Sequence, residues 1–202
     1  MARTRNQDSY DAAREKLLEI GEHLFRQRSF SKTGINDVLA LSGVAKGSFY
    51  HYFASKEAFG IAVARRYSDR QVELARDVLG RTGTPALARL KTFFETARDD
   101  MAKREFKEGC LMCNLTTELA DEIPAFQSEL NDNWCELSEA IAACLDDADL
   151  SVIGLAHLNA EEAADWLLNA WSGALTRMKA TGDAGPLNLF IKSVFKDLEH
   201  SS

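Results

Sequence analysis

The chain has 202 residues, of which 46% are hydrophobic and 27% are charged. This is the balance of a globular protein that is long enough for a sizeable hydrophobic core. No apolar run approaches the ~18 residues of a membrane span, and no apolar segment follows the arginines of the N-terminus as it would in a secretory signal. We therefore expect a cytoplasmic protein that has no membrane partner and whose four cysteines are reduced thiols.

The net charge of −7 is unevenly distributed along the chain. Residues 1–56 contain nine Lys and Arg against six Asp and Glu, whereas the remaining residues contain 15 basic and 25 acidic side chains. The first quarter is thus mildly basic and the rest is acidic. This division is typical of a protein whose N-terminal region meets phosphates and whose body has another task, although chance clustering of charge would give the same counts.

Apolar residues recur at three- and four-residue spacing along most of the chain, and no segment shows the alternation of a half-buried strand. Only three prolines interrupt this pattern. The sequence therefore predicts an all-α fold of about nine helices. We expect them at residues 9–28, 33–43, 46–52, 55–79, 85–101, 110–119, 123–145, 160–180 and 186–198, with a loop over 146–159.

Residues 34–53, GINDVLALSGVAKGSFYHYF, carry the pattern of two short helices that cross at a sharp angle. Gly43 lies between them, where the chain needs a residue that is free to adopt a positive φ. The apolar side chains around it would hold both short helices against the first helix, and these are Val38, Leu39, Val44 and Phe49. The segment therefore predicts a helix-turn-helix.

The polar side chains of the second short helix suit contact with double-stranded DNA. Small residues at its start allow a close approach, and hydroxyl, imidazole and ammonium groups reach bases or phosphates. Lys56 begins the next helix and would add a phosphate contact. The residues expected to bind DNA are Thr33, Gly34, Lys46, Gly47, Ser48, Tyr50, His51, Tyr52 and Lys56. A plain helical hairpin is the alternative, but Tyr50, Tyr52 and Phe53 cannot all face inward on one short helix.

Residues 46–59, KGSFYHYFASKEAF, closely resemble the signature of the TetR family of repressors. Ala45 departs from the family pattern, in which Ser or Thr often caps the recognition helix. The resemblance implies a homodimer, a three-helix DNA-binding domain, a fourth linking helix and a pocket for a small-molecule effector in the C-terminal helices. We accordingly expect a helix-turn-helix domain at residues 1–54 and an effector-binding and dimerisation domain at residues 55–202.

A narrower resemblance concerns residues 109–115 and 166–179, which are similar to segments of the electrophile- and acrylate-responsive members of that family. It implies that Cys110 is a sensor for a reactive electrophile. Lys103, Arg104 and Lys107 would lower the pKa of this thiol, whereas Glu105 and Glu108 would oppose them. The candidate effector residues are Cys110, Cys113, Asn114, Trp134, Trp166 and Arg177. We expect two of the three tryptophans to be core residues, and Arg177 to pair with either an anionic ligand or a second subunit.

Cys110 and Cys113 form a C-x-x-C pair, which on its own also fits a redox motif or half of a zinc site. The βαβ pattern of a thioredoxin-like protein is absent, and the other cysteines and the four histidines lack the spacing of further zinc ligands. We therefore predict no metal site, no cofactor and no enzymatic activity. An all-α thiol redox protein is the alternative function, and two small buried thiols are the structural alternative.

The last two expected helices have the composition of a dimer interface. One carries a row of small residues that permits close approach, and the other is apolar over too wide an arc for one neighbour to cover. The residues expected at this interface are Ala163, Ala170, Ala174, Leu187, Phe190, Ile191, Val194 and Phe195. A terminal helix that is simply buried is the alternative.

Overall fold

The computed structural model describes residues 2–196 and 198, with side chains from residue 8 onward. These residues form nine α-helices, one 3₁₀ helix and no strand. In chain order the helices are α1 (Ala2–Arg28), α2 (Ile35–Ser42), α3 (Lys46–Tyr52), α4 (Lys56–Leu79), α5 (Ala86–Lys103), α6 (Leu111–Leu119), α7 (Pro124–Leu145), η1 (Leu150–Ile153), α8 (Ala160–Thr181) and α9 (Gly185–Val194). None of the described helices is both long and apolar enough to pass through a membrane.

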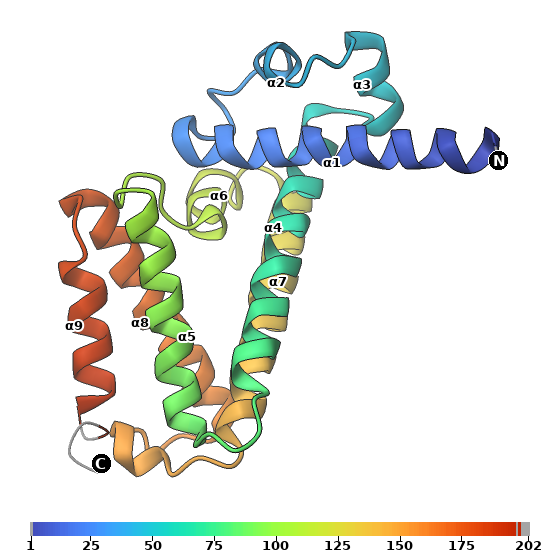
Figure 1. Cartoon of the computed structure of the whole chain (residues 1–202). Coiled ribbons are helices and arrows are strands. Elements are labelled where there is room, and N and C mark those ends of the chain that lie inside the picture. The colour runs from blue at the N-terminus through green and yellow to red at the C-terminus, as the bar shows by residue number, and fades with distance from the viewer. Residues whose placement is uncertain (1, 197, 199–202) are drawn as a thin grey trace.

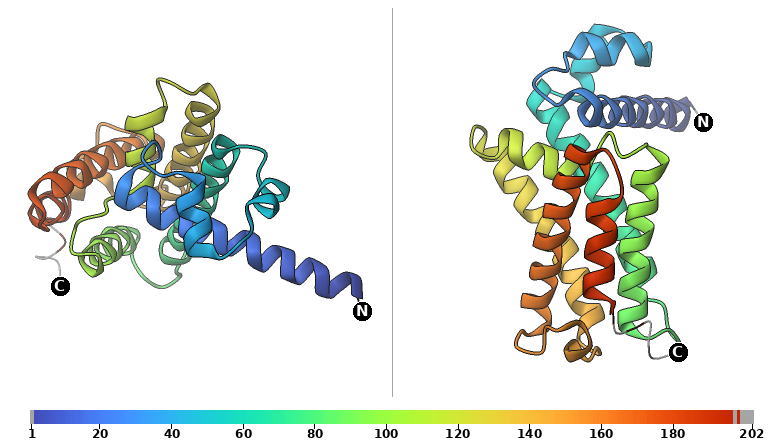
Figure 2. Two further views of the ribbon diagram at one scale, coloured as in Figure 1. Left: turned by 90° about the horizontal axis from the view of Figure 1, so that it is seen from above. Right: turned by 90° about the vertical axis from the view of Figure 1, so that its left-hand side faces the viewer.

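Helices α1, α2 and α3 form a head at one end of a helical body (Figure 1). Helix α1 lies across the end of the body, and α2 and α3 lie on its far side (Figure 2). Helix α4 leaves the head and runs along the body, where it packs against α7, while α7 packs against α8 and α8 against α9. Helix α4 is therefore the direct link between the recognition segment and the body.

Local sequence signals set most of the helix ends. Gly43 follows α2 in the left-handed region at φ 71°, and Ser55 caps α4 by accepting the N–H of Ala58 at 3.0 Å. Helix α8 begins with a capping box in which the side chains of Asn159 and Glu162 accept each other's backbone N–H. Because these signals are local, the bounds predicted for α3 and α4 agree with the structure.

The start of α2 differs from the prediction. Thr33, which we predicted as the N-cap at the start of the helix expected at residues 33–43, lies before α2 and does not cap it, because its hydroxyl donates instead to the carbonyl of Ser29 at 2.8 Å. Gly34 is the N-cap, and its N–H is bonded by the carboxylate of Asp37 at 2.8 Å.

The structure differs from the prediction in three further places. Helix α1 begins at residue 2 instead of near Ser9, η1 lies inside the predicted loop 146–159, and α9 ends at Val194 instead of near residue 198.

Two hydrophobic cores fill the molecule, and one of them crosses from head to body. The lower core lies among α4, α5, α7, α8 and α9 and includes Phe94. The upper core combines Phe25 of α1 and Phe49 of α3 with Leu115 of α6 and Phe126 of α7. The helix-turn-helix thus shares its apolar interior with α4, α6 and α7.

Gly60 on α4 shows how tight this junction is. A Cβ atom at this position would lie 2.5 Å from the ring of Phe30 and 2.7 Å from the ring of Phe126. Only a residue without a side chain lets the segment after α1 and the start of α7 meet over α4.

Candidate DNA-binding face and effector pocket

The outer face of α3 presents the polar side chains that the sequence predicts for DNA contact. Phe49 is fully buried and anchors the helix, whereas Tyr50 is 50% exposed at the next position. Lys46, Gly47 and His51 are exposed and Ser48 is half-buried. One buried aromatic ring therefore holds a helix whose other side is available to a partner.

Two of the residues predicted to contact DNA have other roles in the structure. Thr33 is 1% exposed and its hydroxyl is bonded within the head, so its side chain is not available to DNA. Lys56 is half-buried: its ammonium lies 4.4 Å from the centre of the Phe30 ring and donates to the carbonyl of Ser31 at 3.4 Å. Burial lowers the pKa of Lys56, and the carboxylate of Glu118 opposes this effect.

Tyr52 is also partly withdrawn from the outer face. Its ring stacks on that of Tyr10 with centroids 4.5 Å apart, and the Tyr10 hydroxyl donates to the carbonyl of His51 at 3.3 Å. Helix α1 therefore supports α3 through an aromatic contact that the sequence analysis did not identify.

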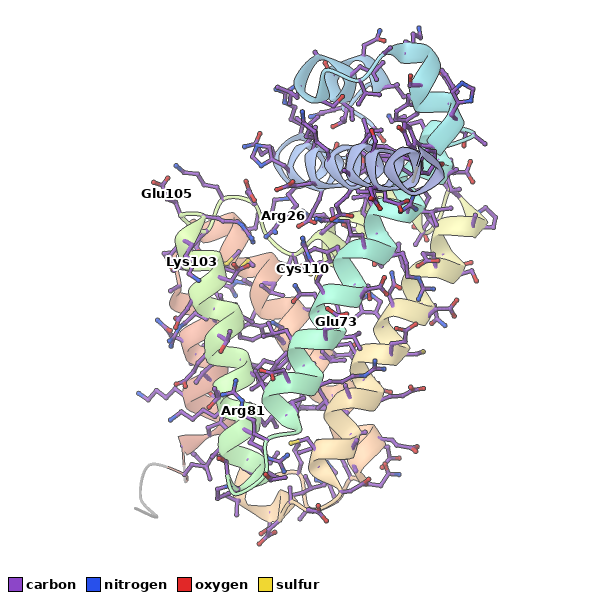
Figure 3. The ribbon with its side chains drawn as sticks, turned by 45° about the vertical axis from the view of Figure 1, so that its right-hand side comes forward. Arg26, Glu73, Arg81, Lys103, Glu105 and Cys110 are labelled. Atoms are coloured by element: carbon purple, nitrogen blue, oxygen red, sulfur yellow. The ribbon has the colours of Figure 1, made fainter. Side chains whose placement is uncertain are left out.

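A cavity of about 540 Å³ lies where α1 crosses the body, and residues of α4, α5, α6, α7 and α8 complete its walls. This is the size of a small-molecule site. Figure 3 shows Arg26 and Cys110 at this junction of head and body. The apolar part of the lining is Leu74, Phe93, Ala97, Met101, Met112, Trp134, Leu137, Leu168, Trp171 and Leu175, and the charged part gathers beneath α1.

Cys110 lines this cavity as the N-cap of α6 and is half-buried. The hydroxyl of Tyr67 on α4 donates to its sulfur at 3.6 Å. The pKa of Cys110 is lowered to about 6, chiefly because the thiol of Cys113 donates a hydrogen bond to it, and also because backbone N–H groups at the start of α6 do so. The same contact, together with burial, raises the pKa of Cys113, which stays a neutral thiol.

Two of the three cations that were expected to act on Cys110 have carboxylate partners, and the third, Lys103, lines the cavity. Lys107 pairs with Glu105, and Arg104 pairs with Asp100 at 2.7 Å and with Glu108 at 3.6 Å. The sequence left the balance of these charges open, and hydrogen bonds at the start of α6 are the main cause of the lowered pKa of the thiol.

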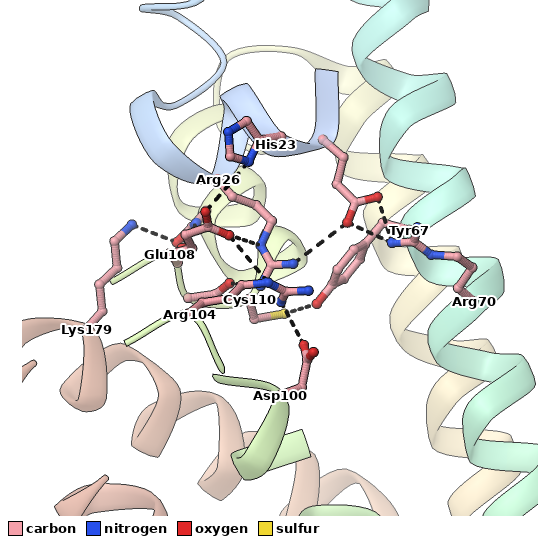
Figure 4. Close-up of polar contacts among 12 residues, drawn as sticks. His23, Arg26, Tyr67, Arg70, Asp100, Arg104, Glu108, Cys110 and Lys179 are labelled. Carbon is pink, nitrogen blue, oxygen red and sulfur yellow. Dashed lines mark hydrogen bonds and ion pairs between the residues drawn. The ribbon is translucent and has the colours of Figure 1, made fainter. Parts of the chain in front are cut away.

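Arg26 forms the roof of the cavity and was not identified from the sequence. Its guanidinium donates to the carbonyl of Gly109 at 2.9 Å, pairs with Glu108 at 3.5 Å and with Glu22 at 3.7 Å, and lies 5.6 Å from the ring of Tyr67 (Figure 4). It therefore joins α1 to the residue that precedes Cys110.

Glu22 continues this network from α1 to α4. Glu22 is 7% exposed, and its carboxylate accepts hydrogen bonds from Arg66 and from Arg70, each at 2.7 Å. A buried carboxylate requires such partners. The sequence signal was the i, i+4 pair Glu22–Arg26 within the apolar stretch of the first helix, because two charges in such a stretch need partners from elsewhere in the fold.

Three other candidate effector residues lie in different places relative to the cavity. Trp134 lines the cavity, and Cys113 lies on an outer groove that also borders Trp134. Asn114 lies outside the cavity, where it donates to the carbonyl of Glu108 at 3.1 Å and accepts from Lys179 at 3.0 Å.

Trp166 and Arg177 do not line the cavity at Cys110. Trp166 is 46% exposed and Arg177 is exposed, and both lie on the outer face of α8 in a groove shared with α9. Trp171 is 6% exposed and lines the cavity, and Trp134 is half-buried and packs against both cores, so two of the three tryptophans belong to the core, as predicted.

Most residues predicted at the dimer interface belong to the core of a single chain. Six of them are at most 7% exposed without any partner present, and these are Ala163, Leu187, Phe190, Ile191, Val194 and Phe195. Helix α9 satisfies its wide apolar arc by packing on α8 and α5. Ala170 and Ala174 are half-buried and lie in the outer groove of α8 and α9, together with Leu189, which is 65% exposed.

Comparison with known proteins agrees with this architecture. Residues 17–63 match the family model described as bacterial regulatory proteins of the tetR family, and residues 86–194 match the tetracyclin repressor-like C-terminal domain. The chain belongs to the TetR family. Ligand-responsive, DNA-binding control of transcription is the role of this family, whose members bind operator DNA and act as dimers.

Several relatives match over most of their length. The repressor DhaR of Mycobacterium sp. strain GP1 is 29% identical over 185 residues, covering 92% of this chain and 91% of that protein. The repressor NemR of Escherichia coli K12 is 32% identical over 154 residues, covering 74% and 68%.

Solved structures show the same fold. A regulatory protein TetR from Rhodobacter sphaeroides has a TM-score of 0.84 at 27% identity and covers 92% of this chain and 98% of that chain. The reduced form of E. coli NemR has a TM-score of 0.80 at 26% identity and covers 92% and 96%. These matches favour a transcription regulator over a thiol redox protein.

Proposed function

We propose that this chain is a repressor that leaves its operator when a small electrophile reacts with the thiolate of Cys110. The supporting observation is the position of that sulfur. It lies at the start of α6, in the wall of a cavity of small-molecule size, next to groups that tie α1 and α4 to the body. The similarity to NemR and DhaR adds support for a repressor.

The reaction suits the state of the thiol. With a pKa of about 6, Cys110 is mostly ionised at neutral pH, and the thiolate is the nucleophilic form. Its sulfur adds to the electron-poor carbon of a reagent such as acrolein or N-ethylmaleimide, and the adjacent carbon takes up a proton. An uncharged, larger group then occupies the place of a small anion.

Such an adduct would act on two contacts between body and head. The Tyr67 hydroxyl on α4 loses its thiolate acceptor, and the added bulk lies beside Gly109, whose carbonyl holds Arg26 of α1. Helix α4 begins four residues after α3 ends, so a shift of its upper part moves the recognition helix. Because coupling between sites is reciprocal, effector and operator weaken each other's binding by the same factor.

The proposed operator contacts are six residues of α3, of which Ser48 and Tyr52 are half-buried, and Gly34, the exposed N-cap of α2. They are Gly34, Lys46, Gly47, Ser48, Tyr50, His51 and Tyr52. The division into a DNA-binding unit at residues 1–54 and an effector unit at residues 55–202 stays a prediction. This division separates two binding surfaces and not two independent cores, because the upper core contains residues of both units.

The proposed dimer contact is the outer groove of α8 and α9, which exposes Trp166 and Leu189 on either side of Ala170 and Ala174. Arg177 lies at the same groove and is proposed to pair with an acidic group of the second copy. A dimer built there would set two recognition helices about one helical turn of DNA apart, roughly 34–36 Å, and would select a near-palindromic operator.

The test uses a gel shift with the promoter region of the chain's own gene. Wild type and Cys110→Ser are treated with N-ethylmaleimide, and Cys135→Ser serves as a control because Cys135 is exposed on α7 outside the cavity. Wild type and the control should release DNA, whereas Cys110→Ser should remain bound. If Cys110→Ser releases DNA like wild type, or if none of the proteins does, Cys110 is not the sensor.

A further inference from the structure

The second thiol of the pair, Cys113, helps to ionise Cys110 but forms no bond to the electrophile in the proposed alkylation. We propose that Cys110 and Cys113 together form a binding site for monosubstituted trivalent organoarsenic compounds, in which one arsenic atom bridges the two sulfurs. This site goes beyond electrophile sensing, because it requires both thiols and a different class of ligand.

The donor set selects this class of ligand. Zinc in a structural site takes four protein ligands, and among the described residues no three His, Cys, Asp or Glu side chains are grouped to hold a metal. Two sulfurs without a third ligand suit a soft centre that forms only two bonds to protein. An arsenic(III) atom that already carries one carbon substituent forms two bonds to sulfur and is then complete.

The spacing of the two sulfurs suits a bridging atom. Both cysteines are free, and Cys110 is the N-cap of α6 while Cys113 is the third residue of that helix, so the two thiols lie within one helical turn, where the Cys113 thiol donates to the Cys110 sulfur. A disulfide would require the sulfurs to approach to about 2.05 Å. An atom that bonds to both sulfurs leaves them about as far apart as a hydrogen bond does. The backbone at the start of α6 therefore moves less than it would to form a disulfide.

The two thiols are in complementary protonation states for the reaction. The thiolate of Cys110 attacks arsenic first and displaces one hydroxide from a compound R–As(OH)₂. Cys113 attacks second, and its proton leaves with the second hydroxide as water. Two As–S bonds form, two As–O bonds break, and arsenic stays in the +3 state, so no oxidant or reductant is needed.

The organic substituent has an apolar space to occupy. Cys110 opens on the cavity of about 540 Å³, next to Met112, Trp134 and Trp171. Trp134 borders both this cavity and the outer groove that contains Cys113. An aromatic substituent on arsenic would therefore lie beside an indole ring, which provides a fluorescence signal.

The test measures binding without DNA. The full chain is incubated with phenylarsine oxide, and intact mass and free thiols are measured. Wild type and Cys135→Ser should gain one phenylarsenic group, lose two reactive thiols and recover both on treatment with 2,3-dimercaptopropanol. Affinity should fall by about 100-fold or more in Cys110→Ser, Cys113→Ser and Cys113→Ala, because one thiolate lacks the high effective concentration of the second.

Two outcomes overturn the site. Retention of the bridging adduct in both the Cys110 and the Cys113 variants would place it elsewhere, and loss of two hydrogens without gain of arsenic would show that the pair closes to a disulfide instead. Thermal melting of each variant checks that it is folded. Because N-ethylmaleimide forms a bond to Cys110 only, whereas the arsenic site needs bonds to both sulfurs, failure of operator release would leave this site standing, and failure of this site would leave electrophile sensing intact.

Discussion

In the head, the residues that face outward for DNA follow one another on the seven-residue helix α3, whereas the lining of the cavity at Cys110 comes from six helices. The head can therefore be recognised from a short stretch of sequence. The body cannot, because its site exists only once α1, α4, α5, α6, α7 and α8 have come together. The two regions are nevertheless not independent, since the upper core joins them.

The largest expected effects concern one buried and one exposed side chain in and just after α9. Phe195→Asp should prevent stable folding, because Phe195 is 1% exposed within one chain and an unpaired carboxylate there would be buried. Leu189→Asp should leave the chain folded and dissociate the dimer, because Leu189 is 65% exposed in the proposed contact. Circular dichroism and light scattering measure the two effects. A folded, dimeric Leu189→Asp protein would remove this groove as the interface.

The shared core predicts a second pair of effects. Phe94→Ala in the lower core and Phe126→Ala in the upper core remove rings that are both 0% exposed, and each should lower the free energy of unfolding by about 3–5 kcal/mol. Only Phe126→Ala should also weaken operator binding, because its ring lies 5.2 Å from that of Phe30 in the head. Urea unfolding and fluorescence anisotropy test this. Equal losses of operator affinity would show that the two cores do not differ in this respect.

The activation of Cys110 predicts a pH dependence. Because its pKa is lowered to about 6, the reactive thiolate is present above this pH and is lost below it. Its rate of reaction with N-ethylmaleimide should fall by about tenfold from pH 7 to pH 5. Stopped-flow measurements against Cys110→Ser as background give this rate, and Tyr67→Phe should move the midpoint upward. A rate that instead climbs steeply through pH 8–9 contradicts the lowered pKa.

The smallest expected effect separates two lysines of the DNA-binding region. Lys46 is exposed on α3, and its replacement by alanine should reduce the salt slope of operator binding by about one unit. Lys56→Ala should change the slope less, because its ammonium is held by Phe30 and Ser31. Titrations at several salt concentrations decide between them. The reverse order would mean that Lys56 leaves these partners to bind phosphate.

Helix positions and the recognition segment were predictable from sequence because their causes are local. Gly43 and Ser55 act within one turn of their own helices, and the apolar spacing around Phe49 decides which side of α3 faces inward. The same reasoning was wrong for Thr33, whose hydroxyl donates to the carbonyl of Ser29 and does not cap α2. A local sequence pattern does not determine which of two nearby backbone groups a hydroxyl binds.

Sequence by itself determined the all-α fold and the helix-turn-helix, because periodicity and motif spacing are properties of neighbouring residues, whereas the sensor role proposed for Cys110 rests on a resemblance between short segments. Tertiary structure alone decided what surrounds that thiol and what covers α9. Arg26, Tyr67 and Cys110 lie on three different helices, so no spacing along the chain could place them around one cavity. Likewise, an apolar residue such as Phe195 has the same sequence pattern whether its own chain or a second copy buries it, and only the packing of α9 on α5 and α8 settles which.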